Sequence, residues 1–450
     1  MFLYIGDYKF VRSQSYRMRP GPHLSLGLRH YSQPLKRSQI YSKMSHVYKS
    51  LEEQQKSVYF GHETLNRISF MREESDFITS AIFHDSAKFI FFKETNPLVL
   101  KNSDKKLVVL DNFRLRKHDF WNSAITKWSK DNADHEPTMR DGDAPTILFM
   151  GIEDESVGLD LKSLKLQEDD DKEKFLDYQG RYQGVPYFAV DLTKSRQLEK
   201  EVIAEAYRTL GVEEGSVFFT YSRKHFFGFE DREGALFSHG KQFLDWLARN
   251  LFCPGCGSKV IPIHAGGKLR CTNPNEEGEG ACPVKAASIS NVSFPRTDAV
   301  IITAITNQDK TKMLLSLSKR YAELKMYSCT AGFMEPAETV EVATGREIWE
   351  ETGVVCRRIN IMLTQPWPFP ANLMIGCVAE VEFNGVNENI NLGHDKELAD
   401  ARWFDMEFVR QLIYEKKTMD NPEGINLPNP ESIAYLLIRM VVDQAGNSKL

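Results

Sequence analysis

Long apolar runs, cysteines and an excess of one charge sign are all scarce in this 450-residue sequence. No run approaches the roughly 18 uninterrupted apolar residues of a membrane helix, and one of the longer candidates, Leu436–Val442, contains Arg439. We therefore predict no membrane-spanning segment and no membrane partner. Lys and Arg number 57 against 62 Asp and Glu, a net charge of −5, so bulk electrostatics give no reason to expect nucleic acid as a partner.

Seven cysteines are too few for a disulfide scaffold, yet four of them fall within 30 residues: Cys253, Cys256, Cys271 and Cys282. The first pair lies in a tight CPGCG turn, and four thiolates suit a tetrahedral zinc ion. We predict one structural zinc per chain and a reducing compartment. Four buried free thiols are the alternative. The segment around the cysteines has four basic residues against three acids and no aromatic interleaving, which argues against a nucleic-acid role.

Composition and spacing divide the chain into five predicted segments. These are a basic leader or disordered tail over 1–55, a β-rich N-terminal domain closed by a helix over 56–250, a zinc ribbon over 251–290, a C-terminal domain over 291–447, and a terminal tripeptide over 448–450. The chain as a whole is predicted to belong to the α+β class.

The N-terminal domain shows short apolar runs separated by polar spacers, a pattern typical of buried strands. Four such runs are Phe89–Phe92, Leu107–Leu110, Ile147–Met150 and Val217–Tyr221. Ala235–Leu251 has apolar residues at helical spacing. The acidic run Gln167–Lys174 is predicted to be a solvated loop.

The C-terminal domain begins with the same strand pattern and then changes. Its predicted strands are Val300–Thr303, Met313–Leu317, Ile359–Leu363 and Met374–Ala379. Gly332 and Pro336 indicate a loop, and Thr339–Thr352 is predicted to be a helix that ends at Gly353.

Three carboxylates lie on one face of that helix. Glu347, Glu350 and Glu351 are spaced at i, i+3 and i+4, so their like charges repel. A divalent cation such as Mg²⁺ or Mn²⁺ would remove this repulsion and share coordination with substrate phosphates. Arg346 is placed to orient the carboxylates or to meet a phosphate. A solvated acidic face is the alternative.

The opposite face of the helix is predicted to meet a sheet. Val342, Gly345 and Trp349 point that way at helical spacing, and Gly345 is expected to allow a close approach of the sheet.

The complete spacing, G-x5-E-x7-R-E-U-x-E-E-x-G-U with U apolar, resembles the Nudix box at every defined position. The matching residues are Gly332, Glu338, Arg346, Glu347, Ile348, Glu350, Glu351, Gly353 and Val354. The resemblance implies an α/β/α Nudix sandwich that cleaves a nucleoside diphosphate linked to another moiety.

A proline-rich segment, Thr364–Asn372, follows the box. Its prolines at alternate positions stiffen the backbone, and Trp367 and Phe369 offer flat faces to a heterocycle. A rigid loop with buried aromatics is the alternative. The segment resembles the SQPWPFPxS motif of the NADH pyrophosphatase branch, with Thr364 and Asn372 replacing the two serines, and Phe294 stands where many members have tyrosine. The resemblance covers roughly residues 57–440.

The resemblance implies roles for particular residues of this sequence. Glu347, Glu350, Glu351, Arg346 and Glu338 would be catalytic, and the backbone of Ala331 with Glu347, Glu350, Glu351 and Glu397 would bind Mg²⁺ or Mn²⁺. Without the resemblance Glu397 is an ordinary surface acid. The substrate would contact Phe333, Gln365, Pro366, Trp367, Pro368, Phe369, Pro370, Ala371, Asn372 and Ala434.

The activity implied by the resemblance is hydrolysis of NADH, and of NAD⁺, to nicotinamide mononucleotide and AMP. Removal of NAD caps from RNA is an alternative main task, because the same bond is cut. A catalytically inactive dinucleotide-binding Nudix module is the alternative from another class. The family also implies a homodimer.

The two ends of the sequence bear on localisation. Residues 1–44 carry eight Lys and Arg and one acid, which is typical of an organellar leader; a disordered tail, or an extension ahead of a start at Met44, are the alternatives. Ser448-Lys449-Leu450 is a receptor-read peroxisomal address. We predict the peroxisome, with the import receptor as a partner, and keep a mitochondrial or cytosolic pool as the alternative.

Deleting Ser448–Leu450 is expected to move the protein from punctate peroxisomes to the cytosol without changing kcat, because the predicted site residues end at Ala434. Fluorescence microscopy of a fusion that preserves the C-terminus tests this. Mitochondrial labelling by that fusion would contradict the prediction and make residues 1–44 the operative address.

Overall fold

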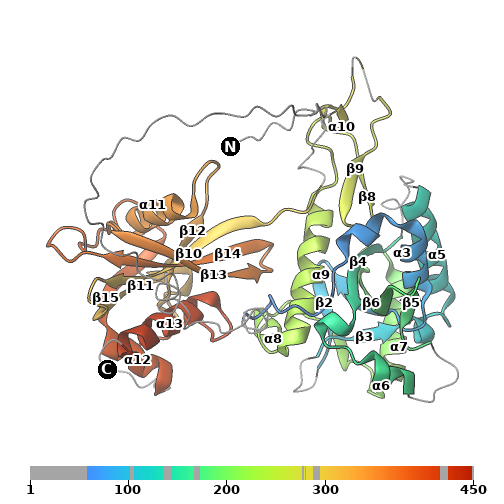
Figure 1. Cartoon of the computed structure of the whole chain (residues 1–450), viewed down its shortest axis with the longest axis horizontal. Helices are drawn as coiled ribbons and strands as arrows, with labels where there is room; N and C mark the ends of the chain where they lie inside the picture. The colour runs from blue at the N-terminus through green and yellow to red at the C-terminus, as the bar shows by residue number, and fades with distance from the viewer. Residues whose placement is uncertain are drawn as a thin grey trace, which may run out of the picture. The chain divides into compact units, whose positions relative to one another are not determined.

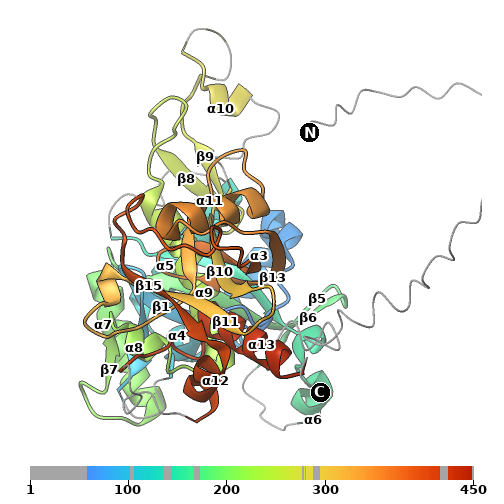
Figure 2. The ribbon, with the colours of Figure 1, turned by 90° about the vertical axis from the view of Figure 1, so that its left-hand side faces the viewer.

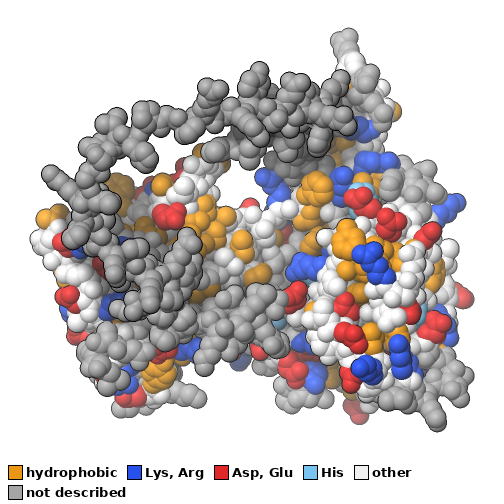
Figure 3. Space-filling view, in the orientation of Figure 1, with side chains coloured by type: hydrophobic (Ala, Val, Ile, Leu, Met, Phe, Trp, Pro, Cys, Tyr) orange, Lys and Arg blue, Asp and Glu red, His pale blue; other side chains and the backbone are white. Residues whose placement is uncertain are grey.

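The computed structural model describes residues 58–101, 106–134, 143–166, 173–275, 278, 280–286, 294–415 and 424–447. The predicted leader, the tripeptide Ser448–Leu450 and most of the acidic run Gln167–Lys174 lie outside the described residues. Side chains of both charge signs intermix on the face seen in Figure 3. Among the helices that the structure describes, none has the length and apolarity needed to cross a membrane.

The first sheet has seven strands, in the order β4-β6-β1-β2-β7, with β3 paired to β1 and β5 paired to β6. Only the β1–β6 pair is parallel. The strands are β1 (Lys88–Lys93), β2 (Asn96–Leu100), β3 (Val109–Asp111), β4 (Thr146–Glu153), β5 (Leu176–Tyr178), β6 (Tyr182–Asp191) and β7 (Val217–Phe219). The four runs predicted as strands overlap, in chain order, with β1, β3, β4 and β7.

The apolar runs are continuous because both faces of this sheet are covered. In β1, Phe89 and Phe91 face one hydrophobic cluster while Ile90 and Phe92 face another. The elements around the sheet are η1 (Ser69–Glu73), α3 (Ser75–Phe83), α4 (Asn112–Leu115), α5 (Asp119–Asp134), η3 (Glu155–Val157), α6 (Leu161–Leu166), α7 (Arg196–Leu210), α8 (Arg223–Phe226) and α9 (Asp231–Arg249). Helix α9 confirms the helix predicted over Ala235–Leu251.

A small β-hairpin carries the cysteine cluster. Strands β8 (Val260–Ile263) and β9 (Lys268–Cys271) pair antiparallel, and α10 (Pro283–Ala286) follows the last cysteine.

The second sheet has six strands, in the order β13-β14-β10-β11-β15, with β12 paired to β10. Its elements are β10 (Asp298–Asn307), β11 (Lys312–Ser318), η5 (Lys319–Tyr321), β12 (Thr330–Phe333), α11 (Val340–Thr352), β13 (Arg358–Trp367), β14 (Asn372–Val381), β15 (Leu398–Asp405), α12 (Met406–Tyr414) and α13 (Ile433–Asn447). The parallel pair β10–β14 runs in register from Asp298 opposite Asn372 to Asn307 opposite Val381.

Helices cover both faces of this second sheet. Helix α11 lies on one face, and α12 and α13 lie on the other (Figures 1 and 2). In β10, Ile305 packs with Ile348 of α11, whereas Ala304 packs with Leu437 and Ile438 of α13. The predicted α/β/α sandwich is therefore confirmed.

Candidate functional site

Helix α11 is formed by local signals that are present in the sequence. The Thr339 hydroxyl caps its start by accepting the Val342 backbone N–H at 3.3 Å. Gly353 ends it with φ 73°, and its N–H donates to the Trp349 carbonyl at 2.8 Å. The helix predicted over Thr339–Thr352 is confirmed.

The prediction of which helix face meets the sheet was wrong. Val342 and Trp349 are exposed, and the buried side chains include Ala343, Ile348 and Glu351. A Cβ added at Gly345 would come no closer than 3.9 Å to the Ile359 Cδ1 atom, so no close approach of the sheet requires this glycine. The face of α11 that carries the glutamates is thus partly buried against the rest of the domain.

Arg346 connects three of the box carboxylates. Its Nε donates to Glu338 Oε1 at 2.6 Å, and its Nη1 donates to Glu347 Oε1 at 2.8 Å and to Glu350 Oε2 at 3.0 Å. Its Nη2 donates to Glu338 Oε2 and to the Phe333 carbonyl, both at 3.0 Å. The guanidinium therefore holds these carboxylates in fixed positions.

The same contacts set the charge states of the carboxylates. Hydrogen bonds from Arg346 and from the Glu335 backbone lower the pKa of Glu338 to about 2. Burial raises the pKa of Glu347, and Arg346 opposes this rise.

Glu351 is the most buried carboxylate of the group, with 4% of its surface exposed. Burial raises its pKa to about 8, and the charges of Glu347, Glu397, Asp395 and Glu350 raise it in the same direction. A buried glutamate surrounded by other acids must bind either a proton or a cation to relieve the repulsion between their negative charges. This donor set of clustered carboxylate oxygens fits a hard divalent cation.

Glu397 lies close enough to this cluster for its charge to act on Glu351, although it is 45 positions beyond Thr352, the last residue of α11. Its carbonyl accepts the Lys319 N–H at 3.1 Å, and its N–H donates to Asp395 Oδ1 at 3.0 Å. The resemblance alone singled out Glu397, and sequence reasoning missed Asp395. The sequence does show two acids, Asp395 and Glu397, two positions apart. Their approach to Glu351, however, depends on the path of the loop that carries them.

Gly332 and its neighbours form β12, not the loop that the sequence predicted at Gly332. β12 pairs with the central strand β10, with Gly332 opposite Ile301. A Cβ at Gly332 would lie 2.0 Å from the Glu347 carboxyl carbon, so a glycine is needed for this carboxylate to rest against the strand. Ala331 is partly buried beside it, and the Phe333 side chain is 59% exposed.

Replacing Gly332 with alanine is expected to displace the Glu347 carboxylate and to lower kcat by about tenfold or more, because catalytic groups tolerate little misplacement. The displaced group is the end of a flexible side chain, so the fold should survive. The control is Gly345→Ala in α11, where the added methyl has room; it should keep activity and gain about 0.5–1 kcal/mol of stability. Steady-state kinetics and thermal melts measure both. Equal activity of the two variants would contradict the placement of Glu347.

Gln365, the first residue of the intact QPWPFP segment, is fully buried. Its Nε2 donates to the Tyr59 carbonyl at 2.9 Å and to the Glu431 carbonyl at 2.8 Å, and its Oε1 accepts the Ile433 N–H at 2.8 Å. Ala434, the residue after Ile433, is also buried. These contacts favour a positioning role for Gln365, while its predicted contact with substrate remains a prediction.

The aromatic residues of the segment pack within a ring cluster. Trp367 and Phe369 each lie edge-on to Phe60, with centroids 6.0 and 5.9 Å apart. Phe369 also stacks on Phe226 at 5.7 Å, and the Arg223 guanidinium lies 4.9 Å from its centroid. Pro368 and Ala371 are buried and Pro370 is exposed. Trp367 and Phe369 are half-buried, and the segment as far as Trp367 belongs to strand β13, so the alternative of a rigid loop with buried aromatics fits only in part.

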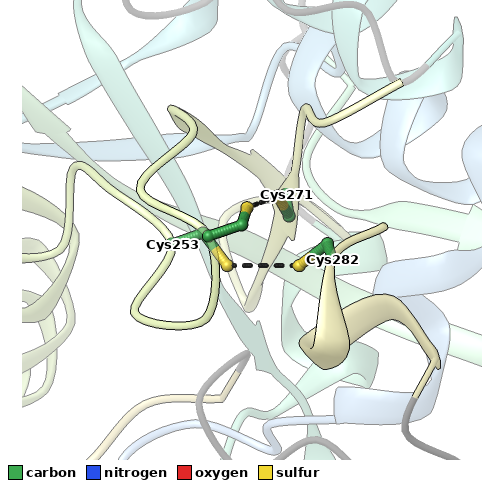
Figure 4. Close-up of side chains that lie close together, drawn as sticks. Cys253, Cys271 and Cys282 are labelled. Carbon is green, nitrogen blue, oxygen red and sulfur yellow. Dashed lines mark hydrogen bonds between the residues drawn. The ribbon is translucent and has the colours of Figure 1, made fainter. Parts of the chain in front are cut away.

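The four clustered cysteines lie together in space. Their sulfur atoms are all within 4.8 Å of one another. The Cys253 and Cys282 sulfurs are 3.5 Å apart (Figure 4), and so are the sulfurs of Cys256 and Cys271. A zinc ion with sulfur ligands at 2.3 Å would hold its sulfurs about 3.8 Å apart. The geometry and the donor set therefore fit a closed four-thiolate site.

A comparison with protein families gives a match over most of the second sheet and its helices: residues 295–422, which contain all six strands with α11 and α12 but end before α13, match the NUDIX domain. Together with a full-length relative at 39% identity, this match shows that the chain belongs to the Nudix hydrolase family and is an enzyme of that class.

Curated relatives extend over the N-terminal part of the chain as well. The NAD-capped RNA hydrolase NPY1 of Saccharomyces cerevisiae is 39% identical over 398 residues, covering 86% of this chain and 96% of that protein. The NAD-capped RNA hydrolase of Schizosaccharomyces pombe is 31% identical, and the match covers 88% of this chain and 95% of that protein. The NAD-capped RNA hydrolase NUDT12 of Homo sapiens is 28% identical, and the match covers 85% of this chain and 72% of that protein. The resemblance to the NADH pyrophosphatase branch is consistent with these matches.

Proposed function

We propose that this protein hydrolyses the diphosphate of NADH and NAD⁺ to nicotinamide mononucleotide and AMP. The observation that carries the proposal is the buried Glu351 carboxylate, which lies among four other acids beside Arg346. The intact Gln365–Pro370 segment and the names of three relatives that match over most of this chain support an NAD-type substrate.

Mg²⁺ or Mn²⁺ is the cation that these residues would hold. The carboxylates of Glu347, Glu350, Glu351 and Glu397 and the carbonyl of Ala331 are the proposed ligands. When bound, the metal would neutralise the diphosphate and lower the pKa of a coordinated water.

The protein's own residues orient the reaction. Arg346 and Glu338 form a fixed pair that holds Glu347 in place. Glu350 is only partly buried, and where it does not bind the metal its carboxylate would act as the general base that accepts a proton from a water molecule attacking phosphorus. Phe333 presents an exposed ring next to this cluster, where it can contact the nicotinamide or the adenine.

We also propose that Cys253, Cys256, Cys271 and Cys282 bind one structural zinc ion per chain. A closed set of four thiolates leaves no position for substrate, so this zinc would contribute to folding alone.

Removal of NAD caps from RNA is a second candidate function, because three relatives that span most of the chain carry the name NAD-capped RNA hydrolase. The acidic net charge of the whole chain does not favour RNA, but a local site suffices to contact one strand. An inactive dinucleotide-binding module is disfavoured, because every box carboxylate is present.

Purified protein with Mg²⁺ or Mn²⁺ should be compared on NADH, NAD⁺, diadenosine diphosphate and NAD-capped RNA by kcat/KM. We expect turnover of the NAD-type substrates, with AMP and nicotinamide mononucleotide as the products of free dinucleotide. Binding without turnover on all four substrates would support the inactive module and reject the proposal.

Two further partners are proposed. One is a second copy of this chain in a homodimer, and the other is the peroxisomal import receptor, which would bind Ser448–Leu450. Size-exclusion chromatography with light scattering measures the oligomeric state, and a mass of about one chain, 51.6 kDa, would reject the dimer.

A further inference from the structure

A cleft of about 490 Å³ opens beside the predicted dinucleotide segment. Its walls come from residues 60–67, from one face of α9, and from the starts of β10 and β14. Pro366 and Asn372, two predicted substrate contacts, line it. The proposed hydrolysis does not use the remaining residues of this cleft.

Positive charge gathers at the cleft. Arg67 and Arg296 line it, against a single lining acid, Glu63. Behind the lining residue Phe243 lies Arg72, whose guanidinium is 5.1 Å from the Phe243 ring centroid. Arg72 is buried, and its Nε and Nη2 atoms have no hydrogen-bond partner among the described residues. A buried cation without a paired carboxylate is costly, and an anion in the cleft would offset part of that cost.

The cleft also offers ring faces and uncharged polar groups. His239 and Phe243 of α9 line it with ring centroids 5.3 Å apart. Burial and the charges of Arg67 and Arg72 hold the pKa of His239 well below its ordinary value, so its ring is neutral at pH 7. Asn372 is 8% exposed, and within the described part of the chain its Oδ1 has no hydrogen-bond partner.

Arginines, ring faces and the unpaired amide oxygen of Asn372 together match the chemistry of one nucleotide. A phosphate pairs with guanidinium groups, a base stacks on aromatic rings, and base edges hydrogen-bond to amides. Pro366 and Asn372 belong both to the predicted dinucleotide segment Gln365–Asn372 and to the wall of the cleft, so a dinucleotide held on that segment would border the cleft.

We propose that the cleft binds the nucleotide that follows the dinucleotide in an RNA chain, with its phosphate between Arg67 and Arg296. Free NADH has no such nucleotide. The cleft therefore raises activity on NAD-capped RNA relative to NADH without taking part in the hydrolysis. This inference rests on the proposed function, because it assumes an NAD-type substrate at the glutamate cluster.

The test compares the double variant R67Q/R296Q with the control R181Q/R357Q, which removes the same charge at two exposed arginines that do not line the cleft. Three quantities are measured for each protein: kcat/KM on NADH, kcat/KM on an NAD-capped octaribonucleotide, and the melting temperature. Binding of the capped octaribonucleotide in EDTA, followed by fluorescence anisotropy at several salt concentrations, gives a readout that does not require the reaction.

We expect R67Q/R296Q to lower kcat/KM on the capped RNA by about tenfold and to leave kcat/KM on NADH within twofold. The slope of log affinity against log salt should fall by about 0.7 for each phosphate that the variant no longer binds, and the control should match the wild type. An equal loss on both substrates, or no loss on RNA, overturns the proposal. If the double variant melts early, R67Q and R296Q are tested singly under the same criteria. If the wild type hydrolyses neither substrate, the proposed function fails, whereas the anisotropy result still decides the cleft.

Discussion

Glu351→Gln is expected to lower kcat on NADH by at least about 100-fold while the protein stays folded. The substitution removes a charge from the centre of the proposed metal site, where removal of one fixed electrostatic interaction costs this much or more. The sequence predicted that the helix face opposite Glu351 meets the sheet, and this was wrong, because Glu351 itself is buried, with only 4% of its surface exposed. Glutamine has the same shape, so packing against the sheet should be retained.

The metal-free protein provides an independent readout. With its pKa raised to about 8, Glu351 without a cation carries a proton at pH 7, and a neutral glutamine replaces it at little cost. We therefore expect equal or higher melting temperatures for the variant in EDTA. Adding Mg²⁺ or Mn²⁺ should stabilise the wild type by binding to its folded state and should stabilise the variant much less.

Glu341→Gln is the matched control, since Glu341 lies exposed in the first turn of the same helix. It should retain activity and the metal-dependent rise in melting temperature. Activity of Glu351→Gln within about threefold of the wild type would reject the metal assignment.

Cys253→Ser is expected to remove most of the bound zinc and to destabilise the protein by about 3 kcal/mol or more, which lowers Tm by roughly 10 °C. Cys253, Cys271 and Cys282 are buried in the same hydrophobic cluster as Trp246 and Leu247 of α9. Loss of the site should therefore loosen the first sheet before it alters the chemistry at the glutamates. Metal analysis and thermal melts measure the two effects.

Cys356→Ser is the control for this experiment, because Cys356 is a free cysteine away from the cluster. It should keep about one zinc per chain. Freshly purified wild-type protein without zinc would end the assignment, whatever the stability of the variant.

Much of the second domain could be predicted from local sequence. The apolar runs at Val300–Thr303 and Met374–Ala379 lie inside β10 and β14, and the cap at Thr339 and the stop at Gly353 mark the ends of α11. These features depend on residues close in sequence, so hydrophobic spacing and terminal residues report them directly. The spacing of the box glutamates likewise depends only on helical geometry.

Tertiary structure decided the features that depend on distant residues. The burial of Glu351 follows from how α11 rotates against the sheet, and helical periodicity predicted the wrong face because exposed Val342 and Trp349 are apolar. Asp395 and Glu397 reach Glu351 only through the path of a loop, and the Arg67–Arg296 cleft joins residues more than 200 positions apart. The sequence by itself determined which carboxylates and thiols are available. The packing of distant segments determined which of them lie close enough to act together, because desolvation and charge repulsion depend on distances in space and not on separation along the chain.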